Sequence, residues 1–367
     1  MSRGIRVLAV AGSSGGHIYP AAGFLSRLRA EDSAIETLLV LPRRCAGSPL
    51  LPAGCGLKYI STVPLKLSLS LGGIIALFRF LKGAIESLGL LLEFKPDVVV
   101  GFGSLDSLPV LLSAWLLREK TIIHEQNVIP GRANRLFARF ADRVAVSFEV
   151  AKKYFKVSPK KIIFTGNPLR PELKKIGRLQ ALSFFGFSGG RFTVLVMGGS
   201  LGSRRINACF LEAAPALAAE GLQVIHICGA QDFAFVNESY KKMNLPVKLF
   251  AFLQEMQYAY SAADLVISRS GAGTIAELIY FGIPALLIPY PYAYQHQLRN
   301  AEVLAEKNAA LIFKDEELKA ADLKETLEGL MREPGKLKGM LSGYCGLSAP
   351  DAARLLVNAV LSLNYAH

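Results

Sequence analysis

The hydrophobic positions of this chain fall into short apolar runs that alternate with amphipathic stretches. Residues 5–29, "IRVLAVAGSSGGHIYPAAGFLSRLR", begin with an apolar run, pass through a glycine-rich turn and end with apolar residues at helical spacing. Further apolar runs follow, with helical stretches between them, at 37–42, 97–103, 121–126 and 143–148. Strands that alternate with helices in this way predict βαβ units and a parallel sheet.

The same pattern starts again at residues 192–218, "FTVLVMGGSLGSRRINACFLEAAPALA". Runs of the same kind continue it at 222–229, 247–253, 265–273 and 284–290. The restart predicts an α/β protein with two Rossmann-like domains. We expect domains at 1–166 and 167–347, joined through the proline-containing segment "IIFTGNPLRPELKK" at 162–175, and a C-terminal helix within about 348–367 that packs back on the first domain.

Composition and charge narrow the choice of partners. Apolar residues make up 51% of the chain and charged residues 19%, which is typical of a globular protein. Residues 1–170 hold 23 Lys and Arg against 11 Asp and Glu, a net charge of +12, whereas residues 171–367 carry only +1. A basic first half favours a nucleic acid, a phosphorylated ligand or an anionic membrane, unless its lysines and arginines only keep the domain soluble.

The segment 67–94, "LSLSLGGIIALFRFLKGAIESLGLLLEF", is strongly apolar. Arg79, Lys82 and Glu86 interrupt it, so it falls short of a membrane-spanning helix. Ile75, Phe78 and Lys82 follow helical spacing. Two interpretations remain open: an amphipathic helix that binds an anionic bilayer surface, or an ordinary core helix with one exposed face.

Two glycine-rich turns, at 11–20 and 197–207, each follow a predicted strand and open a predicted helix. Backbone N–H groups that converge at a helix N-terminus bind phosphate. Neither turn has a dinucleotide fingerprint or the lysine of a nucleotide-triphosphate loop. A minor alternative is that Arg43 and Arg44 hold the 2′-phosphate of NADP.

A third turn lies in "SRSGAGTIAEL", residues 268–278. The small residues before the helix leave its N–H groups open to a diphosphate, while the carboxylate of Glu277 can accept two hydrogen bonds from a vicinal diol. Together they predict a ligand with ribose and diphosphate. The alternative is a solvated glutamate on an amphipathic helix.

Seven segments together resemble the MurG family of bacterial N-acetylglucosamine transferases, which make lipid II from lipid I. They are "GSSGGHIYPA", "HEQNVIPGRANR", "TGNPLR", "VMGGSLGSRRIN", "FLQEM", "ADLVISRSGAGTIAEL" and "QHQLRNA". The resemblance implies the GT-B fold, two Rossmann-like domains facing across a cleft. It implies an inverting, metal-independent glycosyltransferase that needs no cofactor and moves N-acetylglucosamine from UDP-N-acetylglucosamine to the MurNAc 4-hydroxyl of lipid I for peptidoglycan synthesis.

The resemblance also implies roles for individual residues. His17 and Glu125 are the catalytic candidates, and the binding candidates are Ser14, Gly15, Gly16, Asn127, Arg170, Ser200, Leu253, Met256, Ala272, Gly273, Thr274, Ile275, Ala276, Glu277, His296 and Gln297. No Asp-x-Asp pair occurs, so we expect no metal site. The expected partners are UDP-N-acetylglucosamine, a polyprenyl-pyrophosphate-linked acceptor and, through residues 67–94, the cytoplasmic face of the membrane, with no nucleic acid.

One segment departs from the family. The turn "GFGSLDSLP" has Leu105 where the family has tyrosine, followed by Asp106, on the side expected to bind the acceptor. The alternatives are therefore a related GT-B transferase with another lipid-linked acceptor, a UDP-sugar epimerase, or a UDP-sugar sensor without catalytic activity.

Overall fold

The structure, a computed structural model, describes residues 4–46, 55–62, 71–199, 202–292, 295–347 and 351–364. The chain divides into two units. Unit 1 comprises Met1–Pro171 and Pro350–His367, and unit 2 comprises Glu172–Ala349. Each unit is an α/β domain built on one parallel sheet, which confirms the predicted fold class.

Unit 1 contains a seven-stranded sheet in the order β3-β2-β1-β4-β5-β6-β7, in which every neighbouring pair is parallel. The inner strands are continuous apolar runs because helices cover both faces of the sheet. The strands are β1 (Arg6–Val10), β2 (Glu36–Pro42), β3 (Gly56–Ile60), β4 (Val98–Gly101), β5 (Lys120–Glu125), β6 (Arg143–Val146) and β7 (Ile162–Phe164).

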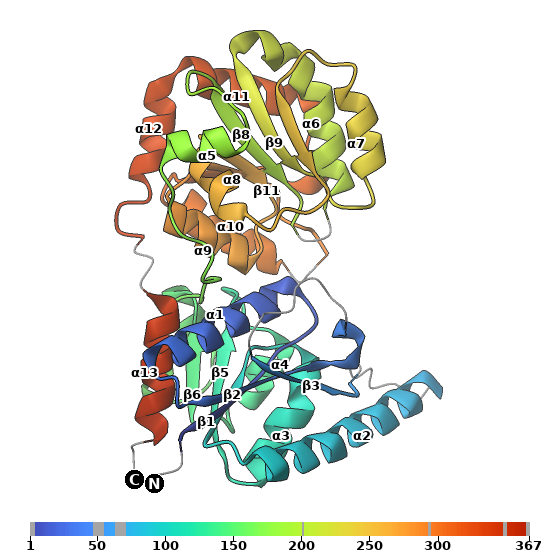
Figure 1. Ribbon diagram of the computed structural model, residues 1–367, viewed down its shortest axis with the longest axis vertical. Coiled ribbons are helices and arrows are strands. Elements are labelled where there is room, and N and C mark those ends of the chain that lie inside the picture. The colour runs from blue at the N-terminus through green and yellow to red at the C-terminus, as the bar shows by residue number, and fades with distance from the viewer. Residues whose placement is uncertain are drawn as a thin grey trace. The chain divides into compact units, whose positions relative to one another are not determined.

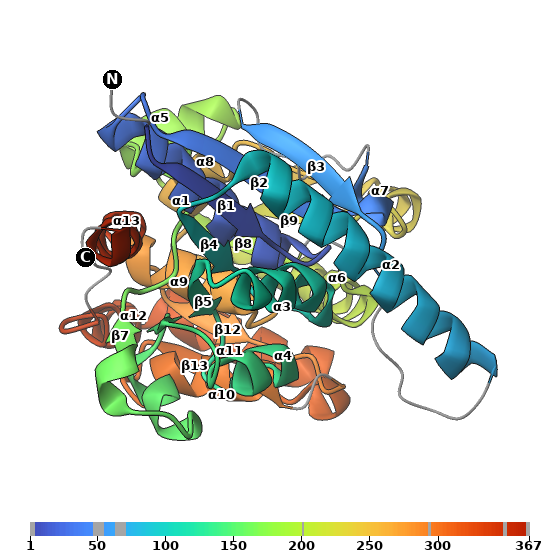
Figure 2. The same ribbon diagram turned by 90° about the horizontal axis from the view of Figure 1, so that it is seen from below.

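Alternate residues of each strand point to opposite faces of this sheet. Val7 and Ala9 pack with α1 and α13 on one face, whereas Leu8 and Val10 share a cluster with α2, α3 and α4 on the other. Figure 1 shows α13, near the C-terminus, beside α1, and both views show the start of α2 extending beyond the sheet (Figure 2). The helices are α1 (Gly15–Glu31), α2 (Leu71–Phe94), α3 (Leu108–Leu116), α4 (Arg132–Phe137) and α13 (Ala352–Asn364).

Unit 2 contains a six-stranded parallel sheet in the order β10-β9-β8-β11-β12-β13. The strands are β8 (Phe192–Met197), β9 (Leu222–Ile227), β10 (Val247–Phe250), β11 (Leu265–Ser268), β12 (Ala285–Leu287) and β13 (Ala310–Ile312). The helices are α5 (Arg178–Phe184), α6 (Arg204–Leu217), α7 (Phe233–Tyr240), α8 (Met256–Ala262), α9 (Ala272–Phe281), α10 (His296–Ala305), α11 (Ala320–Arg332) and α12 (Pro334–Ser342).

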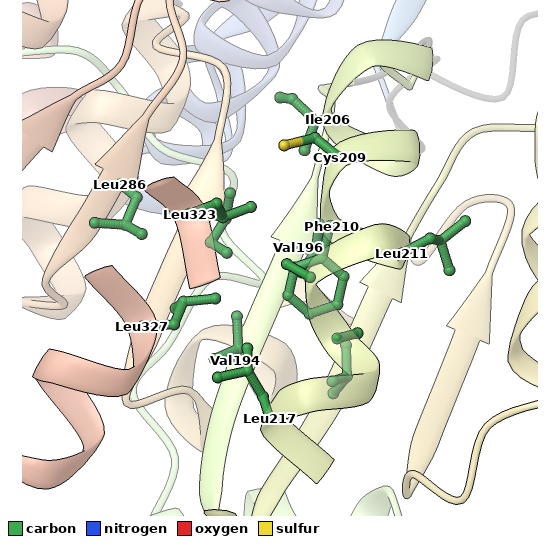
Figure 3. Packing of buried hydrophobic residues seen from close by; sticks show 14 of the residues in the cluster. Val194, Val196, Ile206, Cys209, Phe210, Leu211, Leu217, Leu286, Leu323 and Leu327 are labelled. Atoms are coloured by element: carbon green, nitrogen blue, oxygen red, sulfur yellow. The ribbon is translucent and has the colours of Figure 1, made fainter. Parts of the chain in front are cut away.

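One core cluster of unit 2 lies between its sheet and the helices α6 and α11. Figure 3 shows Phe210 of α6 and Leu327 of α11 converging on Val194 and Val196 of β8. These side chains are fully buried, and burial of each contributes about 1.5–3 kcal/mol relative to exposure. The helix that follows the glycine turn of unit 2 is therefore fixed firmly on the sheet.

In both sheets the strand order reverses beside the first strand of the unit. The reversal lies between β1 and β4 in unit 1 and between β8 and β11 in unit 2. In open parallel sheets, ligands bind at the carboxyl ends of the strands at this switch point. The turns that follow these four strands are therefore the places to examine for a site.

Candidate active site

The turn between β1 and α1 holds four of the candidate residues of unit 1. Ser14 precedes the first residue of α1, its carbonyl accepts the N–H groups of His17 and Ile18, and Gly15 and Gly16 form the first turn. The Ser14 hydroxyl lies 3.0 Å from Nδ1 of His17. The imidazole is thus oriented at the carboxyl end of β1, beside the switch point.

The ring of His17 is half-buried between this turn and the turn that follows β4. Burial lowers the pKa of His17 to about 4, although the nearby carboxylate of Asp106 acts in the opposite direction. A ring with this pKa is neutral at pH 7, so one of its nitrogens can accept a proton.

The other catalytic candidate, Glu125, ends β5 and is only 1% exposed. Its carboxylate accepts hydrogen bonds from the backbone N–H of Asn127 at 2.9 Å, the backbone N–H of Gly131 at 2.9 Å, and the side-chain amides of Asn127 at 3.2 Å and Asn134 at 2.9 Å. Burial raises the pKa of Glu125, and these bonds act against that rise. The carboxylate, for which the resemblance implies a catalytic role, is instead enclosed by these donors. It closes the loop between β5 and α4, and this placement does not favour it as a proton acceptor.

The sequence did not reveal the buried side chains that support this loop. His124 is fully buried, its Nε2 lies 2.9 Å from the carbonyl of Gly166, and its Nδ1 lies 3.1 Å from the side-chain amide of Gln126. Burial lowers the pKa of His124 to about 4. The motif "HEQN" therefore consists mainly of side chains that hold the loop, and Asn127 is its half-buried member at the end.

Arg170, the last binding candidate of unit 1, is half-buried after β7. Its guanidinium lies 4.4 Å from the centre of the Tyr19 ring, a cation–π contact with α1. The contact places the cation beside the helix that carries His17.

In unit 2, Ser200 lies outside the described residues, but the rest of its turn is described. Gly202 has φ +80°, and a Cβ there would come within 2.2 Å of the carbonyl of Cys228, so only glycine fits. The hydroxyl of Ser203 accepts a hydrogen bond from Arg269 at 2.9 Å. Arg269, which follows β11, also bonds the carbonyl of Ile288 at 3.1 Å. It thereby joins the turns on both sides of the switch point.

The helix α9 starts at this switch point with Ala272, after Gly271, and has no acidic residue in its first turn. Gly273, Thr274, Ile275 and Ala276 continue it for little more than its first turn, and its N-terminal N–H groups carry the partial positive charge that favours an anion. Glu277 follows, and its Oε2 accepts a hydrogen bond from the buried Tyr260 hydroxyl at 2.6 Å. Tyr260 was not among our candidates.

The remaining candidates of unit 2 differ in how they are held. Leu253, in the loop before α8, and Met256, the first residue of α8, are buried. His296 and Gln297 open α10 and are half-buried. Oε1 of Gln297 accepts the N–H groups of Ser270 at 3.2 Å and Tyr290 at 3.0 Å. Its amide nitrogen Nε2 is therefore the group that can donate to a ligand.

The arginines considered for a 2′-phosphate are already paired with carboxylates. Arg44 forms an ion pair with Asp106, and Arg43 lies 3.4 Å from Glu86. This arrangement does not favour the NADP alternative.

The helix α2 exposes a row of large apolar side chains. Phe78 is 68% exposed and Ile85 71%, while Ile75, Leu77, Leu81 and Leu92 are also exposed. Trp115 and Leu116 are exposed at the end of α3, which packs on α2. Among the described helices, none combines the length and the hydropathy needed to cross a bilayer.

Comparison with known proteins covers nearly the whole chain. Residues 7–146 match the glycosyltransferase family 28 N-terminal domain, and residues 193–356 match the glycosyltransferase family 28 C-terminal domain. A relative from Halalkalibacterium halodurans, named UDP-N-acetylglucosamine--N-acetylmuramyl-(pentapeptide) pyrophosphoryl-undecaprenol N-acetylglucosamine transferase, is 35% identical over 96% of this chain and 98% of its own length.

Two solved structures extend the comparison. The crystal structure of Acinetobacter baumannii MurG is 26% identical, has a TM-score of 0.75 and covers 98% of this chain and 99% of its own. The UDP-GlcNAc 2-epimerase from Neisseria meningitidis, bound to UDP-GlcNAc, has a TM-score of 0.68 with 98% and 100% coverage, but at 14% identity it shows the shared fold alone. The chain therefore belongs to glycosyltransferase family 28, and its full-length relatives place it in the MurG family.

Proposed function

We propose that this protein transfers N-acetylglucosamine from UDP-N-acetylglucosamine to the MurNAc 4-hydroxyl of lipid I, forming lipid II. The observation that carries the proposal is the 35% identity, over 96% of the chain, to a relative named for this transfer. The geometry of each unit supports it, because candidate binding residues of both units lie at switch points of their sheets.

The transfer is an in-line displacement with inversion. The acceptor oxygen forms a bond to the anomeric carbon, the bond from that carbon to the β-phosphate oxygen breaks, and its electron pair leaves with UDP. His17 accepts the proton of the acceptor hydroxyl. When Nδ1–H donates to Ser14, Nε2 carries the lone pair that takes this proton.

Unit 2 binds the donor in this proposal. The diphosphate lies at the N-terminus of α9, Glu277 accepts the ribose hydroxyls, and Nε2 of Gln297 donates to the transferred sugar. Ser200, Leu253, Met256 and His296 keep the roles that the resemblance implies, at the phosphate, the uracil and the sugar. Stabilisation of the leaving UDP comes from the helix N-terminus and from Arg170.

Glu277→Ala is expected to weaken UDP-N-acetylglucosamine binding by about 1–3 kcal/mol, because a charged hydrogen-bond acceptor is lost. Calorimetric titration measures the change, with Glu212→Ala as control because Glu212 is an exposed glutamate of α6 in the same unit. An affinity equal to that of the control variant would rule out the ribose role.

The exposed row on α2 supports peripheral attachment to the cytoplasmic face of the membrane. Its apolar side chains are flanked by the exposed cations Arg79 and Lys82, in the half of the chain that carries a net charge of +12. Apolar side chains inserted at the headgroup level and cations near anionic lipids act together. Such attachment brings a polyprenyl-linked acceptor within reach.

Replacement of Ile75 and Phe78 with Ser is expected to lower binding to anionic vesicles at least tenfold, since each side chain contributes about 1.5–3 kcal/mol when fully buried. Both are exposed, so folding and turnover of a soluble acceptor analogue should persist. Vesicle co-sedimentation measures binding. Leu179→Ser with Phe184→Ser, two exposed apolar residues of unit 2, is the matched control. Unfolding of the α2 variant would instead assign these side chains to the core.

The proposed function is tested with radiolabelled UDP-N-acetylglucosamine and a lipid I analogue. Label should appear in the lipid fraction only when the acceptor is present. Conversion of the sugar nucleotide without acceptor would instead indicate an epimerase, and binding without turnover would indicate a sensor.

A further inference from the structure

The carboxylate of Asp106 is 2% exposed and lies among side chains from the ends of neighbouring strands. It forms an ion pair with Arg44, which follows β2. Its Oδ1 accepts the hydroxyl of Thr62, after β3, at 3.1 Å, and its Oδ2 accepts the hydroxyl of Ser104, after β4, at 3.0 Å. One buried carboxylate therefore joins the carboxyl ends of three strands.

Arg44 extends this network to a fourth strand. Its guanidinium donates to the carbonyl of Thr62 at 3.2 Å and to the hydroxyl of Ser13 at 3.2 Å. Ser13 lies in the glycine turn after β1, immediately before Ser14. The network therefore includes the turn that orients the imidazole of His17.

The backbone of Ser104 is strained, so the hydrogen bonds around it have to hold it in place. Its φ of 71° and ψ of 148° lie in a region that essentially only glycine adopts. A non-glycine residue keeps such a conformation only when its surroundings hold it there. Here its hydroxyl donates to Asp106, and its carbonyl accepts the Ser107 hydroxyl at 2.7 Å.

Gly12 lies in the narrow space between Ser104 and His17. A Cβ on Gly12 would come within 2.4 Å of the Ser104 Cβ and 2.9 Å of His17 Nδ1. The side chain of Ser104 and the imidazole of His17 therefore both border the space beside the Cα of Gly12, which only glycine leaves open. If the backbone of Ser104 relaxes, the surface beside the ring of His17 changes.

We propose that Asp106 is a positioning residue for the transfer reaction, which, with Arg44, holds the strained Ser104 turn and the glycine turn in register around His17. The inference rests on the proposed role of His17 as the proton acceptor. Asp106 itself does not touch the reacting atoms. The ion pair serves geometry here, since the side chain of Arg44 is 41% exposed and a pair of that exposure adds little net stability.

The test is the isosteric variant Asp106→Asn, which loses the charge and one acceptor oxygen. It should lower kcat about tenfold to 10²-fold, the scale of a displaced catalytic group. The Kd of UDP-N-acetylglucosamine should change less than about twofold, because the proposed donor-binding residues other than Arg170 lie in unit 2 and Arg170 is not part of the Asp106 network. Asp142→Asn is the matched control: Asp142 accepts the N–H of Thr121 at 2.8 Å at the amino ends of β5 and β6, and its loss should lower Tm without lowering kcat.

A rescue experiment separates positioning from general stabilisation. Glycine adopts the backbone of residue 104 without strain, so Ser104→Gly combined with Asp106→Asn should recover most of the lost kcat. If Asp106→Asn does not fold, Ser104→Ala replaces it, since alanine keeps the strain but loses the hydroxyl, and kcat should again fall. Unchanged kcat in the folded single variant, or a loss that glycine does not restore, overturns the inference. If His17→Ala leaves kcat unchanged, His17 is not the proton acceptor. That result is distinct from those that overturn the role of Asp106, so the two proposals can be tested separately.

Discussion

His17→Ala is expected to lower kcat by about 10²–10⁴, the usual contribution of a general base, while the affinity for UDP-N-acetylglucosamine stays nearly unchanged. The imidazole is oriented by Ser14 at the carboxyl end of β1, and burial keeps it neutral. Single-turnover transfer to a lipid I analogue measures the loss. A decrease below about tenfold, equal to ~1.4 kcal/mol in the barrier, would contradict the base role.

The pH profile gives an independent check of this assignment. Burial lowers the pKa of His17 to about 4 from the usual 6.5, so the ring stays unprotonated well below pH 6.5. The acidic limb of kcat should therefore lie nearer pH 4 than pH 6.5. The same shift means that the unfolded chain takes up this proton first on acidification, so stability should decline as the pH falls from 6.5 towards 4.

Glu125→Ala is expected to lower the free energy of unfolding by several kcal/mol, since each buried N–H group that loses its acceptor costs about 1–3 kcal/mol. The substitution leaves the backbone N–H of Gly131 and the side-chain amide of Asn134 without their carboxylate. Urea denaturation measures the loss, for which Glu149→Ala, an exposed glutamate of the same unit, is the control. A stability close to that of the control would mean that the carboxylate does not hold the loop.

The inner strands of both sheets could be predicted from sequence because they are buried on both faces and therefore uniformly apolar. The strands that we did not expect are β3, β7 and β13. They lie at the edges of the two sheets, where few side chains are buried, and the residues of β7 are all only half-buried. Residues 162–164, interpreted as part of a connection, therefore form a strand. A short edge strand leaves little hydrophobic pattern to detect.

The glycine turns and Glu277 could be found because each is a local signal, a turn followed by a helix. The residues that form hydrogen bonds or ion pairs at these sites could not be found from the sequence. Tyr260 is 17 residues from Glu277, and Arg44 is 62 residues from Asp106, so only the order of the strands brings them together. Asp106, an acidic residue in the apolar segment after β4, is the one local feature of the sequence that indicates a cation nearby. Glu125 stood out as a polar residue, but its burial depends on a loop whose closure the sequence does not reveal.

The position of α13 in unit 1 has a consequence for the newly made chain. Leu356, Val357, Val360 and Leu363 belong to the same buried cluster as α1 and one face of the first sheet, although unit 2 separates them from Pro171 in the sequence. At about 5–20 residues per second, the ribosome releases α13 roughly 10–40 s after the rest of unit 1. Throughout that interval the part of the apolar face that α13 covers is exposed. The first unit to be synthesised is thus the last to be completed, and a premature stop within unit 2 also removes α13 from unit 1.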